Sequence, residues 1–359
     1  MAAHGTTETV TVWKKEVILE SRPQGLPTDG NVRLRELEFT YTRPLHDENS
    51  VVLKVLFISI DPYVREIMNE DGMLTGIPSL KLGELIRAYS VSKVVATNHR
   101  DFKEGDIVFA ITPVTNYVLI RVGSGFPLRK IKREDAEVPL ANYLGVLGMP
   151  GHTAWLGLNI ITQLNGKEEL YVSAAAGAVG LLAGQLAKLK GCRVVGSAGS
   201  DEKVKLLKEV YKYDDAFNYK TEKDWEVALK RRFPDGIDVY FENVGGRMLE
   251  AVLDNIKKKG RIVVCGMISQ YNKKSSERNG VRNLMLVVGK SLRMEGFLEG
   301  DFPGTWDAFL DEVSQYLQEG KIKYDTDVLG RGIEEFTKAL VRLLKGENTG
   351  KAVLFVSNE

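Results

Sequence analysis

The stretch Tyr171-Val-Ser-Ala-Ala-Ala-Gly177-Ala-Val-Gly180 decides the fold of this chain. A short apolar run leads into small residues and then into a helical pattern that we expect from Ala178 to Lys190. Gly177 has no Cβ to block the approach of a phosphate, and Gly180 allows the helix to pack tightly against the strand. The start of the helix offers backbone N–H groups and its dipole to an anion. The stretch therefore predicts a dinucleotide-binding turn, with a ligand-free packing turn as the alternative.

The turn departs from the usual G-x-G-x-x-G pattern at one position, because Ala175 stands where the first glycine is expected. Small residues at every turn position between a strand and a helix still favour phosphate binding. The residues expected to contact the cofactor phosphates are Ala174, Ala175, Ala176, Gly177, Ala178, Val179 and Gly180.

Strands and helices alternate along residues 141–320. Continuous β-branched runs joined by helices indicate a parallel sheet that is buried on both faces, and the crossovers should be right-handed. This pattern predicts an α/β domain with a Rossmann-type, doubly wound parallel sheet. The expected strands cover 170–173, 193–197, 215–219, 237–242 and 261–266, and the expected helices 178–190, 201–210, 224–231 and 247–255.

Residues 1–140 have a different character, with short β-rich runs separated by proline and glycine. They predict an irregular, mostly β, barrel-like domain. After about Lys321 we expect a short strand, the helix Ile333–Gly346 and the strand Ala352–Val356. We expect 321–359 to return to the first domain and make it discontinuous. The expected strands of the first part are Val10–Trp13, Val51–Ile60, Ser90–Ala96, Asp106–Ile111 and Tyr117–Val122.

The composition is that of a globular protein, with 359 residues, 43% hydrophobic and 27% charged. A formal charge of +1 gives no overall field that favours nucleic acid or an acidic membrane surface. Cys192 and Cys265 lie in apolar runs, where buried reduced thiols are expected, and two cysteines exclude a disulfide framework or a four-cysteine zinc lobe. Residues 1–8 are small and polar, and no apolar run is long enough for a membrane span. A cytoplasmic location is expected.

The tip of the second strand of the α/β domain indicates which dinucleotide binds. NAD sites carry an acid there, about 20 residues after the glycines. Here the tip is Ser197-Ala-Gly199-Ser200, with no acid. Asp201 and Glu202 follow, but acids in a first helical turn are explained by the helix dipole. Lys203 could reach a 2′-phosphate, or it could simply be a solvated lysine. The missing acid and the available cation favour NADP(H), with Gly199, Ser200 and Lys203 as contacts.

Five motifs occur together and in order across essentially the whole chain. They are Asp61-Pro-Tyr-Val-Arg65, Gly148-Met-Pro-Gly-His-Thr-Ala154, Ala174–Gly180, Tyr240-Phe-Glu-Asn-Val-Gly-Gly246 and Cys265-Gly-Met-Ile-Ser-Gln-Tyr-Asn272. The chain resembles the zinc-free branch of the medium-chain dehydrogenase/reductases, above all the plant NADPH-dependent alkenal double-bond reductases, with mammalian prostaglandin reductases as more distant relatives. This resemblance implies a GroES-like substrate domain beside the Rossmann-type domain. It also implies a homodimer, formed by edge-to-edge pairing of the nucleotide-domain sheets.

The resemblance also assigns residues to the site. Tyr271 would be the catalytic hydrogen-bond donor, with a tyrosine that merely caps its loop as the alternative. Tyr63, Tyr89 and Tyr271 would bind the substrate. Three of the assigned residues also have purely structural interpretations: Tyr63 as a core aromatic, Asn243 as a turn former and Phe297 as part of the sheet core. The further cofactor contacts implied are Pro62, Tyr63, Tyr219, Asn243, Cys265, Tyr271, Phe297 and Asn348.

A metal site is not expected. The four histidines, His4, His46, His99 and His152, have no second ligand at a metal-like spacing, and His152 is expected to pack at a helix start or to tune the substrate site. Without zinc, hydrogen-bond donors must polarise the carbonyl oxygen. The segments 85–90 and 112–117 differ from the family pattern, so substrate preference can differ while the reaction type is kept.

Together these features predict NADPH-dependent, metal-independent reduction of the carbon–carbon double bond in unsaturated aldehydes and ketones. Enals, enones and phenylpropanoid-type compounds are the expected substrates. A quinone reductase of the same superfamily, a non-catalytic NADPH-binding protein and, more remotely, a methyltransferase are the alternatives. Neither nucleic acid nor a membrane is an expected partner.

Overall fold

The structure is a computed structural model that describes residues 7–70, 78–125, 127–132 and 138–359. The chain forms two compact units. The first comprises Met1–Leu144, Val328–Lys345 and Ala352–Glu359, and the second Gly145–Asp327 and Gly346–Lys351. Residues 321–327 and 346–351, expected in the first domain, belong to the second unit, and residues 141–144, expected in the second domain, belong to the first. His4 lies outside the described residues.

The second unit is built on a six-stranded parallel sheet. Its strand order β10-β9-β8-β11-β12-β13 is that of a doubly wound nucleotide-binding sheet. The order reverses between β8 and β11, so the loops that follow these two strands flank the ligand crevice expected of such sheets. The strands are Glu169–Val172 (β8), Arg193–Ala198 (β9), Asp215–Asn218 (β10), Ile237–Glu242 (β11), Ile256–Val264 (β12) and Arg293–Gly296 (β13).

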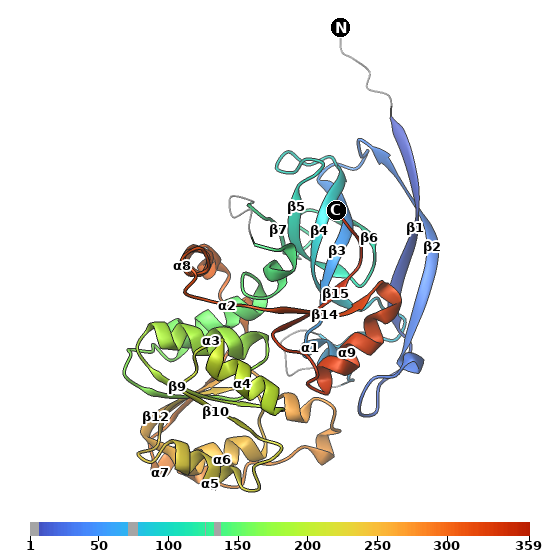
Figure 1. Cartoon of the computed structure of the whole chain (residues 1–359). Helices are drawn as coiled ribbons and strands as arrows, with labels where there is room; N and C mark the ends of the chain where they lie inside the picture. Colours follow the sequence, from blue (N-terminus) through green and yellow to red (C-terminus); the bar gives the residue numbers. More distant parts are fainter. Residues whose placement is uncertain (1–6, 71–77, 126, 133–137) are drawn as a thin grey trace. The chain divides into compact units, whose positions relative to one another are not determined.

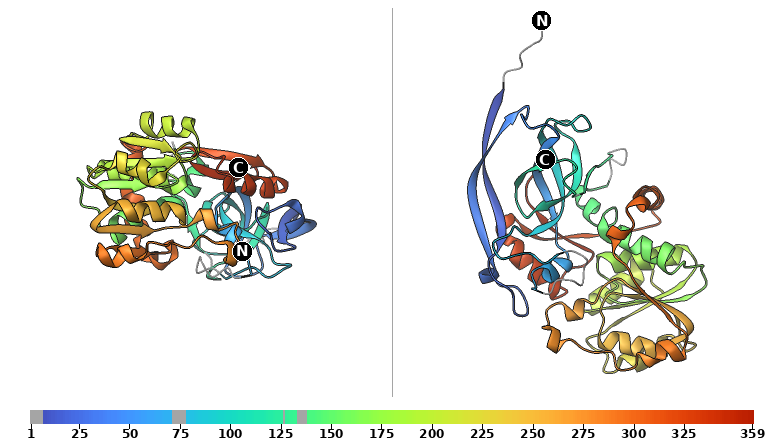
Figure 2. Two further views of the ribbon diagram at one scale, coloured as in Figure 1. Left: turned by 90° about the horizontal axis from the view of Figure 1, so that it is seen from below. Right: turned by 180° about the vertical axis from the view of Figure 1, so that it is seen from behind.

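Helices cover both faces of this sheet (Figures 1 and 2). Ala178–Leu189 (α3) and Asp201–Glu209 (α4) lie on one face; Trp225–Arg232 (α5), Arg247–Asn255 (α6) and Met285–Gly289 (α7) lie on the other. Met149–Leu156 (α2) packs against α3 and against Trp306–Gln318 (α8). Burial on both sides explains the continuous apolar runs of β8, β9 and β11. The short helical elements of this unit are Gly157–Ile161 (η4), Ile268–Gln270 (η5), Ser275–Glu277 (η6), Glu299–Asp301 (η7) and Pro303–Thr305 (η8).

The first unit is mostly antiparallel β structure. One sheet has the order β14-β15-β3-β4-β5-β7, with β6 also paired to β3, and a separate ribbon pairs β1 with β2. The strands are Glu8–Leu19 (β1), Val32–Arg43 (β2), Ser50–Ser59 (β3), Arg87–Thr97 (β4), Ile107–Pro113 (β5), Tyr117–Arg121 (β6), Leu128–Lys130 (β7), Thr326–Arg331 (β14) and Lys351–Phe355 (β15). The short helical elements are Asp29–Asn31 (η1), Tyr63–Ile67 (α1), Leu140–Leu144 (η3) and Ile333–Glu335 (η9).

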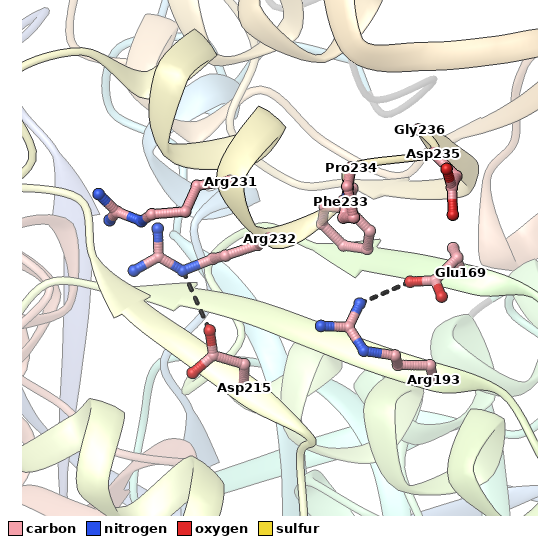
Figure 3. Close-up of a pocket in the computed structure, with 9 residues that line it drawn as sticks. All are labelled: Glu169, Arg193, Asp215, Arg231, Arg232, Phe233, Pro234, Asp235 and Gly236. Atoms are coloured by element: carbon pink, nitrogen blue, oxygen red, sulfur yellow. Dashed lines mark hydrogen bonds and ion pairs between the residues drawn. The ribbon is translucent and has the colours of Figure 1, made fainter.

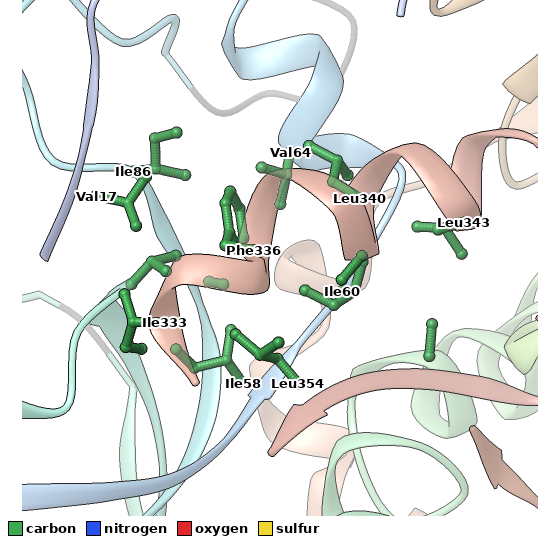
Figure 4. Packing of buried hydrophobic residues seen from close by; sticks show 14 of the residues in the cluster. Val17, Ile58, Ile60, Val64, Ile86, Ile333, Phe336, Leu340, Leu343 and Leu354 are labelled. Atoms are coloured by element: carbon green, nitrogen blue, oxygen red, sulfur yellow. The ribbon is translucent and has the colours of Figure 1, made fainter. Parts of the chain in front are cut away.

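The core of the first unit gathers around the helix Phe336–Leu344 (α9) (Figure 4). Phe336 and Leu340 of α9 lie on the side of Val64 of α1, and Ile58 and Leu354 of the sheet belong to the same buried cluster. A helix seated on an antiparallel sheet buries one face of each element. The predicted fold class, a Rossmann-type parallel sheet plus a mostly β, GroES-like domain, is confirmed.

Candidate functional site

The turn between β8 and α3 has the shape that its small residues predict. A Cβ on Gly180 would lie 2.6 Å from the carbonyl oxygen of Ala174 and 2.7 Å from the Cα of Ala175, so only glycine fits there. A Cβ on Gly177 would meet only the Ala174 oxygen, at 3.2 Å. The Ala175 N–H donates to the Ser197 carbonyl at 2.9 Å, which ties the turn to the end of β9. The first N–H groups of α3 have no acceptor within the helix and follow a glycine without a Cβ, an arrangement that suits a pyrophosphate.

Residues 346–351 complete this turn. The Gly350 N–H donates to the Ala176 carbonyl at 2.8 Å, and Gly177 and Gly350 form an isolated parallel bridge. Asn348 is buried, and its side-chain amide donates to the Gly350 carbonyl at 2.9 Å. A Cβ on Gly350, whose φ is +68°, would lie 2.2 Å from the Asp325 carbonyl oxygen. Gly350 was not among the predicted residues, although an Asn-Thr-Gly turn is a signal for a tight backbone approach.

The floor at the point where the strand order reverses is a buried polar network. The side chain of Asn243 donates to the Ser173 carbonyl at 2.8 Å, and its backbone N–H donates to Ser173 Oγ at 3.0 Å. Oε1 of the fully buried Glu242 accepts from Tyr240 Oη at 2.7 Å and from the N–H groups of Val244 and Gly245 at 2.6 and 2.8 Å. Burial raises the pKa of the Glu242 carboxyl. Ser173 and Glu242 were not predicted, although an acid that ends an apolar strand is a signal for such a network.

The tip of β9 brings together the residues expected to choose the dinucleotide. Ser200 caps α4 by accepting the Lys203 N–H at 3.3 Å. The Lys203 ammonium donates to the carbonyls of Gly346 and Asn348, both at 2.6 Å, and burial lowers its pKa. The Tyr219 ring lies beside Gly199 and packs edge-on to Trp225 with a centroid distance of 6.2 Å. Lys203 therefore holds the 346–348 backbone as well as lying at the tip.

Tyr271, the catalytic residue implied by the resemblance, lies close to the carboxyl end of β12. Its hydroxyl accepts the Met267 N–H at 3.1 Å, and a Cβ on Gly266 would lie 2.8 Å from that oxygen. The Cys265 N–H donates to the Glu242 carbonyl at 3.0 Å, which joins this loop to the floor formed by β11. Burial, together with the charge of Glu242, raises the pKa of the Cys265 thiol to about 12. Tyr271, Cys265 and Asn243 thus share the crevice end of the sheet.

Two further predicted residues of this unit lie near one loop. Phe297 follows β13, and its ring is 6.5 Å from that of Phe302. His152, fully buried in α2, bridges the same loop, with Nδ1 2.8 Å from Glu299 Oε1 and Nε2 2.7 Å from Thr305 Oγ1. Its ring lies 4.3 Å from that of Trp306. The contacts of His152 are those of a residue that packs and anchors, within the second unit.

In the first unit, Pro62 starts α1 and Tyr63 is its first helical residue. The Tyr63 ring is edge-on to Tyr89 at 6.4 Å, and Tyr89 stacks on Phe109 at 5.2 Å. The Arg129 guanidinium lies 5.2 Å from the Phe109 ring centre. Burial raises the pKa of Tyr63 well above that of a free tyrosine. Tyr63 and Tyr89 thus form one aromatic group, to which the structure adds Phe109 and Arg129. The atypical segment 85–90 includes the start of β4, and segment 112–117 connects β5 to β6.

A charged hollow of about 570 Å³ lies at the opposite end of the parallel sheet (Figure 3). Glu169, Arg193 and Asp215 are the first residues of their strands, and Arg232 approaches from the end of α5. Its charges neutralise one another: Arg193 pairs with Glu169 at 2.6 Å and Arg232 with Asp215 at 3.2 Å. Ligands of open α/β sheets bind at the carboxyl ends of the strands, so this hollow is not the candidate site.

Within the described ranges, no three or more His, Cys, Asp or Glu side chains come together in a way that could hold a metal ion. A search of the same residues for a helix with the length and apolar character of a membrane span finds none.

The chain is similar to known proteins over nearly its whole length. The family model described as zinc-binding dehydrogenase matches residues 178–315, and that described as N-terminal domain of oxidoreductase matches residues 15–127. The chain is 45% identical to the 2-alkenal reductase (NADP(+)-dependent) of Nicotiana tabacum, over 97% of this chain and 99% of that protein. It is 41% identical to (+)-pulegone reductase of Mentha piperita, over 97% and 100%. Prostaglandin reductase 1 of Mus musculus is 40% identical, over 96% and 99%.

Solved structures give the same picture. The crystal structure of CurA in complex with NADPH from Vibrio vulnificus superposes with a TM-score of 0.86 at 32% identity, over 96% of this chain and 100% of that one. The Escherichia coli quinone oxidoreductase complexed with NADPH shares the fold, with a TM-score of 0.71 at 22% identity over 94% and 99%.

Proposed function

Because the chain belongs to the medium-chain dehydrogenase/reductase superfamily, we propose that it is an NADPH-dependent reductase of the carbon–carbon double bond in α,β-unsaturated aldehydes and ketones. The observation that carries the proposal is the Tyr271 hydroxyl at the carboxyl end of β12, in a chain 45% identical to a 2-alkenal reductase over nearly the whole of both proteins. The first unit would be the substrate domain and the second the NADP-binding domain.

The residues of the second unit fit NADPH. The uncovered start of α3 at Gly177 would hold the pyrophosphate, through the N–H groups of its first turn. Gly199, Ser200 and Lys203 would lie at the adenosine ribose, with Tyr219 beside the adenine. Asn243, Cys265, Tyr271, Phe297 and Asn348 would line the rest of the cofactor, and Pro62 and Tyr63 would contribute from the first unit. NADPH, when bound, supplies the hydride for the β-carbon of the substrate.

Tyr271 would bind the carbonyl oxygen of the substrate. Negative charge develops on that oxygen as the β-carbon is reduced, and a placed hydroxyl donor stabilises it. The hydroxyl oxygen of Tyr271 accepts the Met267 N–H, which orients the group, and a hydroxyl can both accept and donate a hydrogen bond. A tyrosine, with a reference pKa of about 10, keeps this proton at neutral pH. The enolate then takes a proton at the α-carbon from solvent or a relay.

The aromatic group of the first unit suggests the class of substrate. Phe109 stacks on Tyr89, and Arg129 lies over the Phe109 ring. Tyr63 and Tyr89 would present ring faces and edges to a flat, conjugated molecule. Enals, enones and phenylpropanoid-type compounds such as cinnamyl aldehydes have this shape.

A steady-state screen of NADPH oxidation tests the function. Conjugated enals and enones should be turned over, while saturated ketones should not react. A preference for quinones over enones would indicate a quinone reductase, and NADPH binding without any turnover would indicate a non-catalytic protein. Rates with and without a metal chelator should be equal, because the proposed chemistry uses hydrogen-bond donors in place of zinc.

We also propose that the protein is a homodimer in the cytoplasm. β13 is an edge strand of the parallel sheet, and exposed apolar side chains of α7 lie next to it in sequence: Met285 is 86% exposed and Val288 84%. Pairing of two such edges would cover both features. Cys192 and Cys265 are both free thiols, which suits a reducing compartment.

A further inference from the structure

A second lysine lies over the tip of β9, next to the residues expected to choose between NADPH and NADH. Parallel pairing of β9 with β10 sets Ala198 opposite Asn218, and the Tyr219 N–H continues this with a bond to the Ala198 carbonyl at 3.1 Å. The chain therefore carries Tyr219 and Lys220 past Gly199. A Cβ on Gly199 would lie 3.2 Å from Tyr219 Oη and 3.3 Å from Lys220 Cε. The stem of Lys220 thus covers the glycine at the tip.

The backbone of Lys220 is fixed by a local turn. Its N–H donates to Asn218 Oδ1 at 3.0 Å, and the Asn218 amide in turn donates to Asp201 Oδ1 at 2.9 Å. The ammonium lies 6.0 Å from the ring centre of Tyr219, the residue expected beside the adenosine. Lys220 is therefore tied to the same strand end as the other tip residues, with an exposed side chain that can adjust to a ligand.

The positive charge at this tip is poorly balanced. Lys220 and Lys203 lie close enough for the charge of Lys220 to lower the pKa of Lys203, an effect second to that of burial. Asp327 and Glu347 act on Lys203 in the opposite direction, and Asp201 is engaged by Asn218. The pKa of Glu202 is lowered by its own backbone N–H and by the Ser200 hydroxyl. In the part of the chain that the structure describes, no carboxylate lies within ion-pair distance of Lys220. Two neighbouring ammonium groups are stabilised when an anion binds between them.

The two lysines differ in what they already bind. The Lys203 ammonium has three N–H donors, and two of them are used by the carbonyls of Gly346 and Asn348. Lys220 has no such commitment among the described residues. A dianionic phosphate at the tip can therefore accept more hydrogen bonds from the Lys220 ammonium than from the Lys203 ammonium.

We propose that Lys220 binds the 2′-phosphate of NADPH and that the preference for NADPH over NADH depends on it at least as strongly as on Lys203. The inference rests on the proposed NADP dependence and adds a specificity-determining residue to it. Lys203 then acts chiefly by holding the 346–348 backbone against the tip.

The test is calorimetric binding of 2′,5′-ADP and 5′-AMP to the full chain, because these two nucleotides differ only in the 2′-phosphate. The variants are Lys220→Gln and Lys220→Arg. Lys223→Gln serves as a matched control, since Lys223 is an exposed lysine on the same loop and its loss changes the net charge equally. NADPH and NADH steady-state constants with an enone provide a second readout.

We expect Lys220→Gln to raise the dissociation constant of 2′,5′-ADP about tenfold while 5′-AMP changes less than about twofold. The affinity of Lys220→Gln for 2′,5′-ADP should also depend less on salt than that of wild type. Lys220→Arg should retain most of the preference for 2′,5′-ADP over 5′-AMP, because the charge remains. Equal weakening of both nucleotides, an unchanged 2′,5′-ADP constant, or the same loss in Lys223→Gln would overturn the proposal. A wild-type chain without preference for 2′,5′-ADP would overturn the NADP dependence itself, which separates the two failures.

Discussion

Tyr271 is the residue on which the proposed chemistry depends most directly. Tyr271→Phe removes the hydroxyl that would face the developing charge but keeps the ring, so kcat with an enone should fall at least about tenfold while the KM for NADPH stays within about twofold. Steady-state kinetics measure both constants. Tyr316→Phe, which removes the hydroxyl of a half-buried tyrosine on α8, is the control. Unchanged turnover in Tyr271→Phe would exclude the residue from the mechanism.

Glu242 should make stability depend on pH. Burial raises its pKa above the ordinary 4.5, so the folded chain keeps a proton that the unfolded chain releases. Between the two pKa values stability therefore falls as pH rises, by up to about 1.4 kcal/mol per pH unit. Glu242→Gln removes this titration, so its unfolding free energy relative to wild type should increase from pH 4.5 towards neutrality. Urea unfolding at several pH values measures this, and a constant or decreasing difference would contradict it.

For single residues, the sequence could predict a role that is set by local chain geometry. It could not predict a role that is set by tertiary contacts. Gly180 follows from the strand-turn-helix pattern, and the structure gives its reason in the backbone atoms it approaches. The contacts of Ser173 with Asn243, and of Gly350 with Ala176, join positions far apart in sequence. No local sequence pattern contains such pairs, so the contacts at the floor of the crevice could be identified only from the folded structure.

The packing of α3 against the turn is an element-scale feature that one substitution can test. Gly180→Ala would push a methyl group against the Ala174 and Ala175 backbone, and backbone cannot move aside as a flexible side chain can. We expect a loss of about 1–3 kcal/mol in unfolding free energy and weaker NADPH binding. Chemical unfolding and calorimetry measure the two effects. Gly280→Ala, where a Cβ meets nothing within 4 Å, should change neither, and a Gly180→Ala chain with wild-type stability would contradict this account.

Two elements with a strong buried pattern were predictable to the residue, while a largely exposed ribbon was not. β11 and α6 have the predicted bounds, Ile237–Glu242 and Arg247–Asn255. The β1–β2 ribbon was predicted only over Val10–Trp13, yet β1 spans Glu8–Leu19 and pairs in full with Val32–Arg43. Much of the ribbon is exposed and charged, so its strands lack the apolar runs that mark a core strand.

At the scale of the whole molecule, the proposed dimer makes the clearest prediction. The double substitution Met285→Glu and Val288→Glu would place two charges on the exposed face of α7, where a partner sheet edge would bury them at high cost. Sedimentation velocity should then show a monomer in place of a dimer, with the far-UV spectrum unchanged. Val227→Glu, on the 58% exposed Val227 of α5 in the same unit, should remain dimeric. A monomeric wild type or a dimeric double variant would refute the interface.

The path of residues 328–351 has a consequence for biosynthesis. The chain leaves the second unit after Asp327 and passes through the first unit. It then returns to the second unit at Gly346–Lys351, beside the turn between β8 and α3. A ribosome therefore synthesises all of the parallel sheet well before it delivers Gly350 to Ala176. The nascent sheet can collapse early, but the proposed coenzyme site is completed only when both units have nearly been translated. On this proposal, coenzyme binding waits until nearly all of the first unit has also been made.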